Sequence, residues 1–213
     1  MKKTLNYIVG SIGILLIIFL SLKVENLQEH QAKAPTTIFD ANEYANHFWT
    51  EKLPQRISEA PDANLLLTKL NENPNMAIST YGKKLGISKT YYFLFQGNGV
   101  IQAIDDEYLS VVLNNTQDTL HIATAFIFGN AVRDGSGSVN IDNFINMTDF
   151  NNVSIAINKL VKEKIVPRLK KSAAIGKEID FAGVAELRED QAIPEILSII
   201  PVKANISDGK TEQ

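Results

Sequence analysis

The sequence predicts an α+β fold. It consists of an N-terminal membrane helix, a two-helix cap, and an antiparallel barrel of five strands with one long helix between strands three and four. Two observations predict the barrel. Candidate strands and helix follow the order three strands, helix, two strands, and Gly97 and Gly99 interrupt the long first strand. This order matches an OB-like barrel. An open mixed sheet would give nearly the same pattern, because one sequence does not show which strands pair.

The composition is that of an ordered globular protein, with 213 residues, 45% hydrophobic and 21% charged. The 21 basic and 24 acidic residues leave no basic excess, so we expect no nucleic-acid partner. The sequence contains no cysteine, which excludes disulfides, thiolate metal sites and cysteine nucleophiles from these 213 residues.

Residues 1–23 have the features of a signal anchor. Lys2 and Lys3 precede an apolar run from Tyr7 to Leu22, a pattern typical of a membrane helix. A cleaved signal peptide is the alternative, but the nearest small-x-small site, Ala32 to Ala34, lies far downstream. We therefore expect a single-pass helix in the inner (cytoplasmic) membrane, with the C-terminal part in the periplasm.

The rest of the chain divides by its patterning. Residues 24–37 are rich in polar residues and are expected to form a tether. Residues 38–206 are expected to form a single extracytoplasmic domain, made of a helical cap over 38–80 and the OB-like barrel over 91–206. Residues 207–213 form a polar tail.

The first cap helix is predicted to start at Asp40, a good N-cap residue, and to be kinked or divided at Pro54. Its apolar residues fall near helical spacing: Tyr44, Phe48, Leu53 and Ile57. Together with Trp49, two of these rings could form a platform for a sugar, although helical spacing favours packing of the cap onto the barrel.

The second cap helix is predicted to run from Pro61 to the Asn73-Pro74-Asn75 segment, which ends it. Its apolar face is a leucine cluster: Leu65, Leu66, Leu67 and Leu70.

Five β-rich segments follow, listed here in order: Tyr91 to Ile104, Tyr108 to Leu113, Thr119 to Phe128, Glu178 to Leu187 and Ile196 to Ile206. The Gly97-Asn98-Gly99 segment in the first of them suits either a tight turn or a bulge in one bent strand. A polar loop, Gly129 to Asn143, and a long helix separate the third strand from the fourth. We expect all five strands to share one sheet, because neither set alone has enough strands to be stable.

Short signatures spread through the chain also form a recognisable set: Phe48-Trp49 with Pro54, Tyr81-Gly82, Gly97 to Val100, Gly129 to Asp134, and Phe144 to Phe150. Together they resemble a bacterial family of predicted periplasmic lipoproteins of unknown function. The resemblance covers roughly residues 39–206. Members are often encoded beside sugar ABC-transporter genes, which implies an accessory envelope role with a sugar-like ligand or a transporter component as partner. The chain lacks the lipoprotein cysteine, which leaves the apolar N-terminal segment as its anchor.

The candidate ligand-binding residues lie in these segments: Asn130, Arg133, Asp134 and Asn146. The Arg133 guanidinium could pair with a carboxylate or bind a sugar hydroxyl beside Asp134. The alternative is a structural pair, in which Arg133 binds backbone carbonyls and Asp134 closes a turn with Gly135.

Other chemistry finds little support. Alternating oxygen-bearing residues from Asp134 to Asp142 invite a calcium interpretation, but Val139 and Ile145 stand where an EF-hand loop needs Gly and Glu. His30, His47 and His121 lack zinc-ligand spacing, and Asp105 to Glu107 fit a solvated turn better than a catalytic pair. We expect no metal, cofactor or catalytic residue.

The favoured function is therefore a membrane-anchored extracytoplasmic accessory or binding protein, linked to sugar ABC transport. One alternative is an extracytoplasmic carbohydrate-acting enzyme, in which a pocket would hold Asp134 and a second carboxylate about 5–10 Å apart. Another is a structural scaffold that binds a partner protein through an apolar patch on the cap helices.

Overall fold

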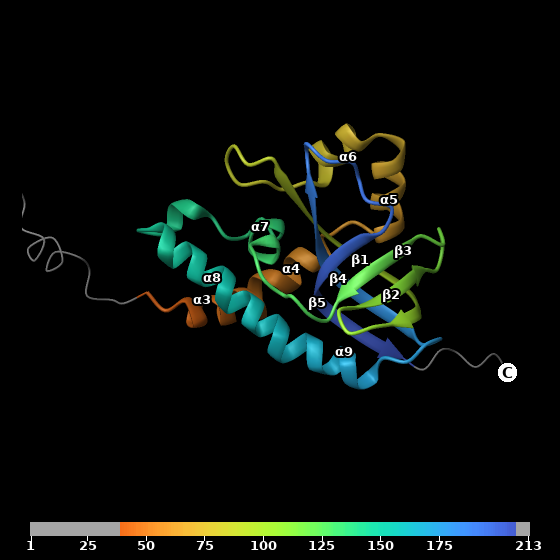
Figure 1. Ribbon diagram of the computed structural model, residues 1–213. Helices are drawn as coiled ribbons and strands as arrows, with labels where there is room; N and C mark the ends of the chain where they lie inside the picture. The colour runs from red at the N-terminus through yellow and green to blue at the C-terminus, as the bar shows by residue number, and fades with distance from the viewer. Residues whose placement is uncertain (1–38, 208–213) are drawn as a thin grey trace, which may run out of the picture. The chain divides into compact units, whose positions relative to one another are not determined.

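The computed structural model describes residues 39–207, in which helices pack against one side of a small β-barrel (Figure 1). The predicted anchor at 1–23, the predicted tether at 24–37 and all but the first residue of the predicted tail lie outside the described residues. In the part of the chain that is described, no helix is both long enough and apolar enough to cross a membrane.

The strands close into a barrel in the order β1-β2-β3-β5-β4. Their bounds are Thr90–Ile104 for β1, Tyr108–Leu113 for β2, Thr119–Ala123 for β3, Glu178–Arg188 for β4 and Leu197–Ser207 for β5. The prediction that both strand sets share one sheet is confirmed. The prediction of a wholly antiparallel barrel is wrong at one pair, since β3 and β5 are parallel. An odd number of strands cannot alternate in direction all the way round a closed barrel, so one neighbouring pair must be parallel.

Strand β1 is one long bent strand, which decides between the two interpretations of its glycines. Its residues Thr90 to Val100 pair with β4, and Gly99 to Ile104 pair with β2. A Cβ on Gly97 would lie 2.8 Å from the Ala63 Cβ, and one on Gly99 would lie 2.3 Å from the Val112 carbonyl oxygen. Both glycines are therefore needed for close packing, against the cap at Gly97 and against β2 at Gly99.

Two helices of the protein contain a π-helical turn directly before a proline. In the cap, α3 (Ala41–His47) continues through the π-turn η1 (Phe48–Lys52) into α4 (Leu53–Ser58), which carries Pro54. After β3, α8 (Met147–Leu160) continues through η3 (Val161–Ile165) into α9 (Val166–Ser172), which carries Pro167. A proline has no N–H and crowds the carbonyl four residues back, and the wider π-turn accommodates both effects.

The predicted start of the first cap helix is confirmed, because the Asp40 carboxylate accepts a hydrogen bond from the Asn42 N–H at 2.8 Å. Its aromatic residues pack rather than form an open platform. Phe48 is buried, and the Tyr44 ring lies 5.3 Å from the Phe144 ring. Helix α3 contacts α8, whereas the later cap helices contact strand β1, so the cap packs on the barrel as predicted everywhere except at its first helix.

The cap also contains a helix that the sequence did not predict. Helix α5 (Ala63–Glu72) ends at Asn73 as expected, but the Asn73 side chain accepts a hydrogen bond from the Met76 N–H and begins α6 (Pro74–Tyr81). The segment interpreted as a helix stop is thus also a helix start, with proline at the first position. Leu65 is 45% exposed and does not belong to the apolar face of α5.

The third strand is shorter than predicted and ends at Ala123. The next backbone N–H groups, those of Thr124 and Ala125, donate to the Glu107 carbonyl, which turns the chain away from the sheet. The predicted polar loop that follows contains a short helix, α7 (Ala131–Gly135), and the 3-10 turn η2 (Ile141–Asn143).

Candidate functional site

Helix α7 packs on the outer surface of β1 and β4 and against α8 (Figure 1). Gly135 permits this close approach, since a Cβ there would lie 2.5 Å from Cγ1 of Val184 and 3.2 Å from Cβ of Tyr92. Gly137, just beyond, has a φ of 62°, which favours glycine where the chain turns away. The two glycines therefore have different structural roles on either side of Ser136.

Arg133 of α7 is buried, with a side-chain exposure of 1%, and it forms a bidentate pair with Asp134. Its Nε donates to Asp134 Oδ1 at 2.7 Å, and its Nη2 donates to Asp134 Oδ2 at 3.1 Å. Its Nη1 donates to the Phe150 carbonyl at 3.1 Å and to Asn151 Oδ1 at 3.3 Å. The guanidinium carbon also lies 3.6 Å from the centroid of the Phe150 ring. Arg133 therefore joins α7 to the first turns of α8.

A ligand-binding Arg133 would present free donors on a concave surface, but all three of its nitrogens donate within the protein, and the Asp134 carboxylate pairs with Arg133 rather than closing a turn with Gly135. Asn146 is the N-cap of α8, where its Oδ1 accepts from the Asp149 N–H at 2.8 Å. Asn130 directly precedes α7 and lines a shallow cavity between that turn and α8. Three of the four predicted residues thus gather at α7, and the fourth caps the helix that Arg133 contacts.

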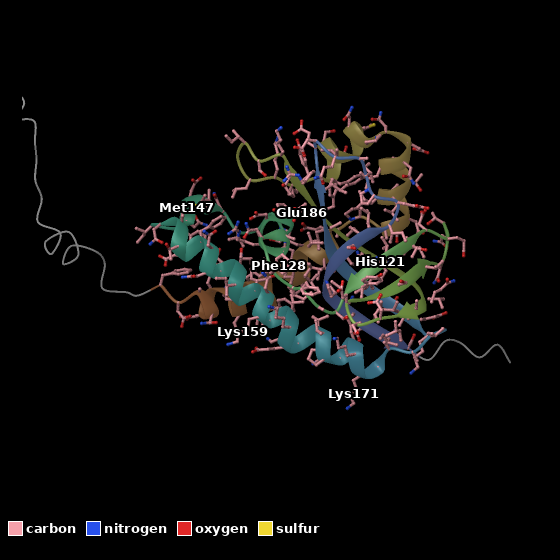
Figure 2. All side chains as sticks on the ribbon, viewed as in Figure 1. His121, Phe128, Met147, Lys159, Lys171 and Glu186 are labelled. Atoms are coloured by element: carbon pink, nitrogen blue, oxygen red, sulfur yellow. The ribbon has the colours of Figure 1, made fainter. Side chains whose placement is uncertain are left out.

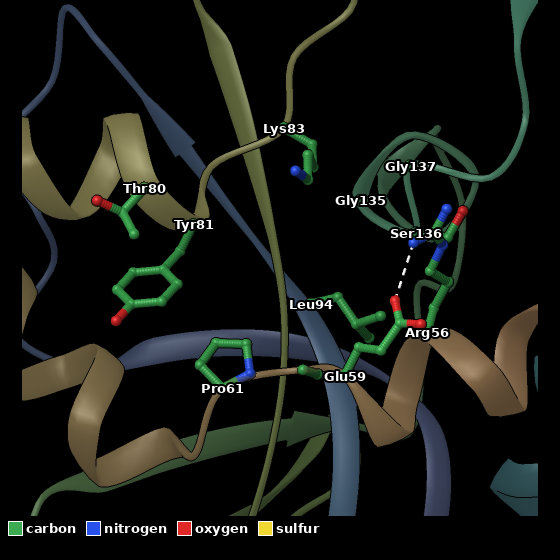
Figure 3. Close-up of a pocket in the computed structure, with 11 residues that line it drawn as sticks. Arg56, Glu59, Pro61, Thr80, Tyr81, Lys83, Leu94, Gly135, Ser136 and Gly137 are labelled. Atoms are coloured by element: carbon green, nitrogen blue, oxygen red, sulfur yellow. Dashed lines mark hydrogen bonds and ion pairs between the residues drawn. The ribbon is translucent and has the colours of Figure 1, made fainter.

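Two adjoining cavities lie between the cap and α7, and we call them together the cap groove. The first, of about 300 Å³, lies among α4, α6 and α7 (Figure 3). The second, of about 330 Å³, lies between the Lys83 to Leu85 segment and the chain from Gly137 to Asn140, and includes Asp134. Lys83 and Gly137 line both cavities, so the two form one continuous surface.

An ion pair and a hydroxyl form one wall of the cap groove. Arg56 donates from Nη1 to Glu59 Oε2 at 2.9 Å and from Nε to Ser138 Oγ at 2.8 Å. Hydrogen bonds from Gln55 and from Arg56 lower the pKa of Glu59, which stays ionised at neutral pH. The side chains of Arg56 and Glu59 are 42% and 49% exposed, so this pair faces solvent in the groove.

Lys83 lies on the opposite side of the cap groove, on the connection from α6 to β1. Its backbone N–H and carbonyl both bond to Tyr92, which fixes its position against the barrel. Within residues 39–207 its ammonium forms no ion pair, and Figure 3 shows it beside the same cavity as Tyr81 and the Arg56–Glu59 pair. The groove therefore offers donors, acceptors and an aromatic ring to one ligand.

Tyr92 lies on β1 beneath α7. Burial, reinforced by the charges of Glu186 and Asp134, raises the pKa of Tyr92 to about 12. Its phenol is therefore neutral across the physiological range and cannot act as a base there.

The two carboxylates of the cap groove line different parts of it, whereas glycoside chemistry requires two carboxyl groups that face one bond. Glu59 lines the first cavity and Asp134 the second, and both oxygens of Asp134 are bound by Arg133. The oxygens proposed for calcium are also engaged: Ser136 donates to the Arg133 carbonyl, and Asn140 accepts from the Asp142 N–H. No group of three or more metal-ligating His, Cys, Asp or Glu side chains occurs among the residues that the structure describes.

Sequence reasoning missed Arg56, Glu59 and Lys83. In the sequence, Arg56 and Glu59 have the spacing of an ordinary pair on a helix surface, and nothing local links them to Ser138, which is 82 residues away from Arg56. Only the fold brings these segments together.

The comparisons with known proteins agree with this fold. A crystal structure of an OB-fold protein from Thermotoga maritima is 30% identical and aligns with a TM-score of 0.72, covering 80% of this chain and all of that one. No curated protein matches the chain. The family model described as predicted periplasmic lipoprotein, DUF2291, matches residues 12–205. The resemblance seen in the short signatures is thereby confirmed, and the chain belongs to the DUF2291 family of predicted periplasmic lipoproteins.

Proposed function

We propose that this protein is an extracytoplasmic accessory protein that binds a small, sugar-like ligand in the cap groove. The observation that carries the proposal is the combination of side chains around one cavity of about 300 Å³: the Arg56–Glu59 pair, Lys83 and the ring of Tyr81. Small-molecule sites generally place a few polar groups of this kind around a concave surface, and their volumes begin at about 300 Å³.

The polar groups of the cap groove suit hydroxyl groups in particular. A sugar hydroxyl both donates and accepts, so a carboxylate such as Glu59 and a cation such as Lys83 can bind neighbouring hydroxyls of one ring. The Arg56–Glu59 pair is already aligned before a ligand arrives, because Ser138 and Gln55 hold its two members. This preorganisation lowers the entropy cost of binding.

The site supports binding rather than catalysis. The two carboxylates of the cap groove line different parts of it, and Asp134 is held by Arg133 in a buried pair. A glycosidase would need two carboxyl groups facing one scissile bond.

The proposal also covers where the protein is anchored and which partner it serves. We infer that residues 1–23 remain as a single-pass anchor in the inner membrane and that the protein serves a sugar ABC transporter at the periplasmic face. The apolar run between lysines supports the anchor. Mass measurement of the protein from the membrane fraction tests this, and a mature N-terminus at or after Val24 would contradict it.

Ligand binding is tested by thermal unfolding of the full-length protein in mild detergent, with monosaccharides as probes. A ligand at 100 times its dissociation constant should stabilise the protein by about 2.7 kcal/mol, which corresponds to a rise of roughly 5–10 °C in Tm. We expect Arg56→Ala and Lys83→Ala to abolish the shift.

The matched control is Arg188→Ala. Arg188 forms a pair with Asp190 at 44% and 40% exposure, close to the values of the Arg56–Glu59 pair, but it lies outside the cap groove. The proposal fails if no monosaccharide shifts Tm, or if Arg188→Ala removes the shift as fully as Arg56→Ala.

A further inference from the structure

A further cavity lies on the outer face of the barrel and is chemically unlike the cap groove. It has a volume of about 290 Å³ and is lined mainly by residues of β2, β3, β4 and β5 and of the segment that leaves β3. We call it the aromatic cavity because three rings line it: Tyr108, Phe126 and Phe128. Phe126 and Phe128 are 70% and 69% exposed, which is unusual for phenylalanine.

The register of the sheet explains the floor of the aromatic cavity. Tyr108 on β2 is paired with Ala123 on β3, and β3 runs beside β5 in parallel. On β4, Val184 is paired with Ile200 of β5. The side chains of these outward-facing positions form an apolar floor, and Tyr108 stacks on His121 with a centroid distance of 3.8 Å.

The chain from Thr124 to Phe128 forms one wall. The Thr124 and Ala125 N–H groups donate to the Glu107 carbonyl at 2.7 and 3.1 Å, which holds this segment beside Glu107. Ile127 is buried and anchors the segment, while its two phenylalanine neighbours stay exposed. Phe126 has a φ of 54°, a conformation that is strained for a bulky residue. The backbone therefore keeps both rings out of the core at some conformational cost.

The charged groups around the aromatic cavity all have one sign. Glu107 and Glu186 line it, and Figure 2 labels Glu186 and Phe128. No lysine or arginine is among the residues that line it, and neither glutamate forms an ion pair in the described range 39–207. Two carboxylates without cationic partners beside three rings form a surface complementary to positive charge.

We propose that the aromatic cavity binds a small alkylated organic cation of the quaternary ammonium class. The ring faces attract the charge, and the two glutamates add long-range attraction. Alanine, valine and isoleucine side chains make up much of the floor, beside the Ser198 hydroxyl, and their methyl groups pack favourably against methyl groups on nitrogen. This site is separate from the cap groove and does not depend on the proposed sugar-like ligand.

The test is titration calorimetry of the full-length protein in mild detergent with choline and tetramethylammonium. The neutral isostere 3,3-dimethyl-1-butanol is titrated alongside, since it has the same shape as choline without the charge. We expect both cations to bind and the isostere to bind at least tenfold more weakly. Equal binding of choline and its isostere, or no binding of either cation at millimolar concentration, would overturn the proposal.

Variants then locate the site. Phe126→Ala and Phe128→Ala should each weaken choline binding by roughly 2- to 30-fold, the range for one cation–π contact. Glu186→Gln should weaken it too, more so at low salt, whereas Glu178→Gln on the same strand is the charge-matched control and should leave it unchanged. Unchanged binding in Phe126→Ala and Glu186→Gln would overturn the assignment. If no monosaccharide raises Tm while choline still binds, the proposed function of the cap groove is refuted and the assignment of the aromatic cavity stands.

Discussion

The two arginine–carboxylate pairs on either side of the cap groove have the same chemistry and different environments. The Arg133–Asp134 pair has side-chain exposures of 1% and 7%, and the Arg56–Glu59 pair has exposures of 42% and 49%. The buried pair binds the backbone of α8 and a phenylalanine ring, whereas the exposed pair binds a serine hydroxyl and faces a cavity.

This difference shows that burial decides what such a pair can do. Both members of a buried pair depend on each other, because each charge would be strongly destabilised in the interior if its partner were removed. An exposed pair contributes little to stability and can exchange its water for a ligand. The buried Arg133–Asp134 pair therefore holds α7 in place beside the cap groove, and the exposed Arg56–Glu59 pair supplies charged groups that face the groove.

The largest expected effect is that of Arg133→Ala. It leaves Asp134 buried without a partner and should cost about 3–5 kcal/mol of unfolding free energy. Arg133→Lys should also be strongly destabilising, because an ammonium cannot form the bidentate pair. Denaturant unfolding followed by fluorescence of Trp49, the single tryptophan, measures both. Stability equal to that of the wild type in Arg133→Ala would contradict the structural role of the buried pair.

A smaller loss is expected for Gly135→Ala, at about 1–3 kcal/mol, because the new Cβ would lie within 2.5 Å of a Val184 methyl carbon. This variant tests whether the position of α7, rather than the ion pair alone, supports the groove. The matched experiment is a double-mutant cycle with Val184→Ala, which makes room for the new methyl group. The two substitutions should be less harmful together than the sum of each alone, and strict additivity would show that the contact is not the cause.

The pH dependence of stability offers a third comparison, confined to alkaline solution. The folded-state pKa of Tyr92 is raised to about 12. The contribution of its neutral phenol to folding stability is therefore complete below the unfolded value of 10.0 and is lost as the pH rises through about 12. Tyr92→Phe should remove this part of the alkaline destabilisation while other groups still titrate. Unfolding midpoints of the two proteins between these pH values measure the effect, and parallel pH profiles would contradict it.

The smallest expected change in stability is that of Arg56→Ala, at about 0–1 kcal/mol, because the pair that it breaks is exposed. The same substitution should nevertheless abolish the response to a ligand in the cap groove. Comparing Arg56→Ala with Arg133→Ala in both assays sharpens the contrast between the two pairs. A large loss of stability in Arg56→Ala would show that the exposed pair is structural as well.

Local patterns in the sequence predicted the elements that depend on neighbouring residues. Asp40 caps the first helix because a carboxylate accepts backbone N–H groups where a helix begins, and the predicted long helix between the third and fourth strands is α8 with its continuation. The helix α6 was missed because Asn73 and Pro74 are compatible with both the end of one helix and the start of the next.

Other features were decided by contacts between distant segments. The Gly97–Gly99 segment is a bent strand rather than a turn because β4, β2 and the cap all approach it, and one sequence does not show these neighbours. The parallel pairing of β3 with β5 follows from closing a ring of five strands. The environments of Arg133 and Arg56 were decided in the same way, because burial depends on which segments pack over a side chain. The residue types by themselves therefore specified most of the helices and strands of this protein, and the tertiary packing decided which of its charged side chains are buried and which face a cavity.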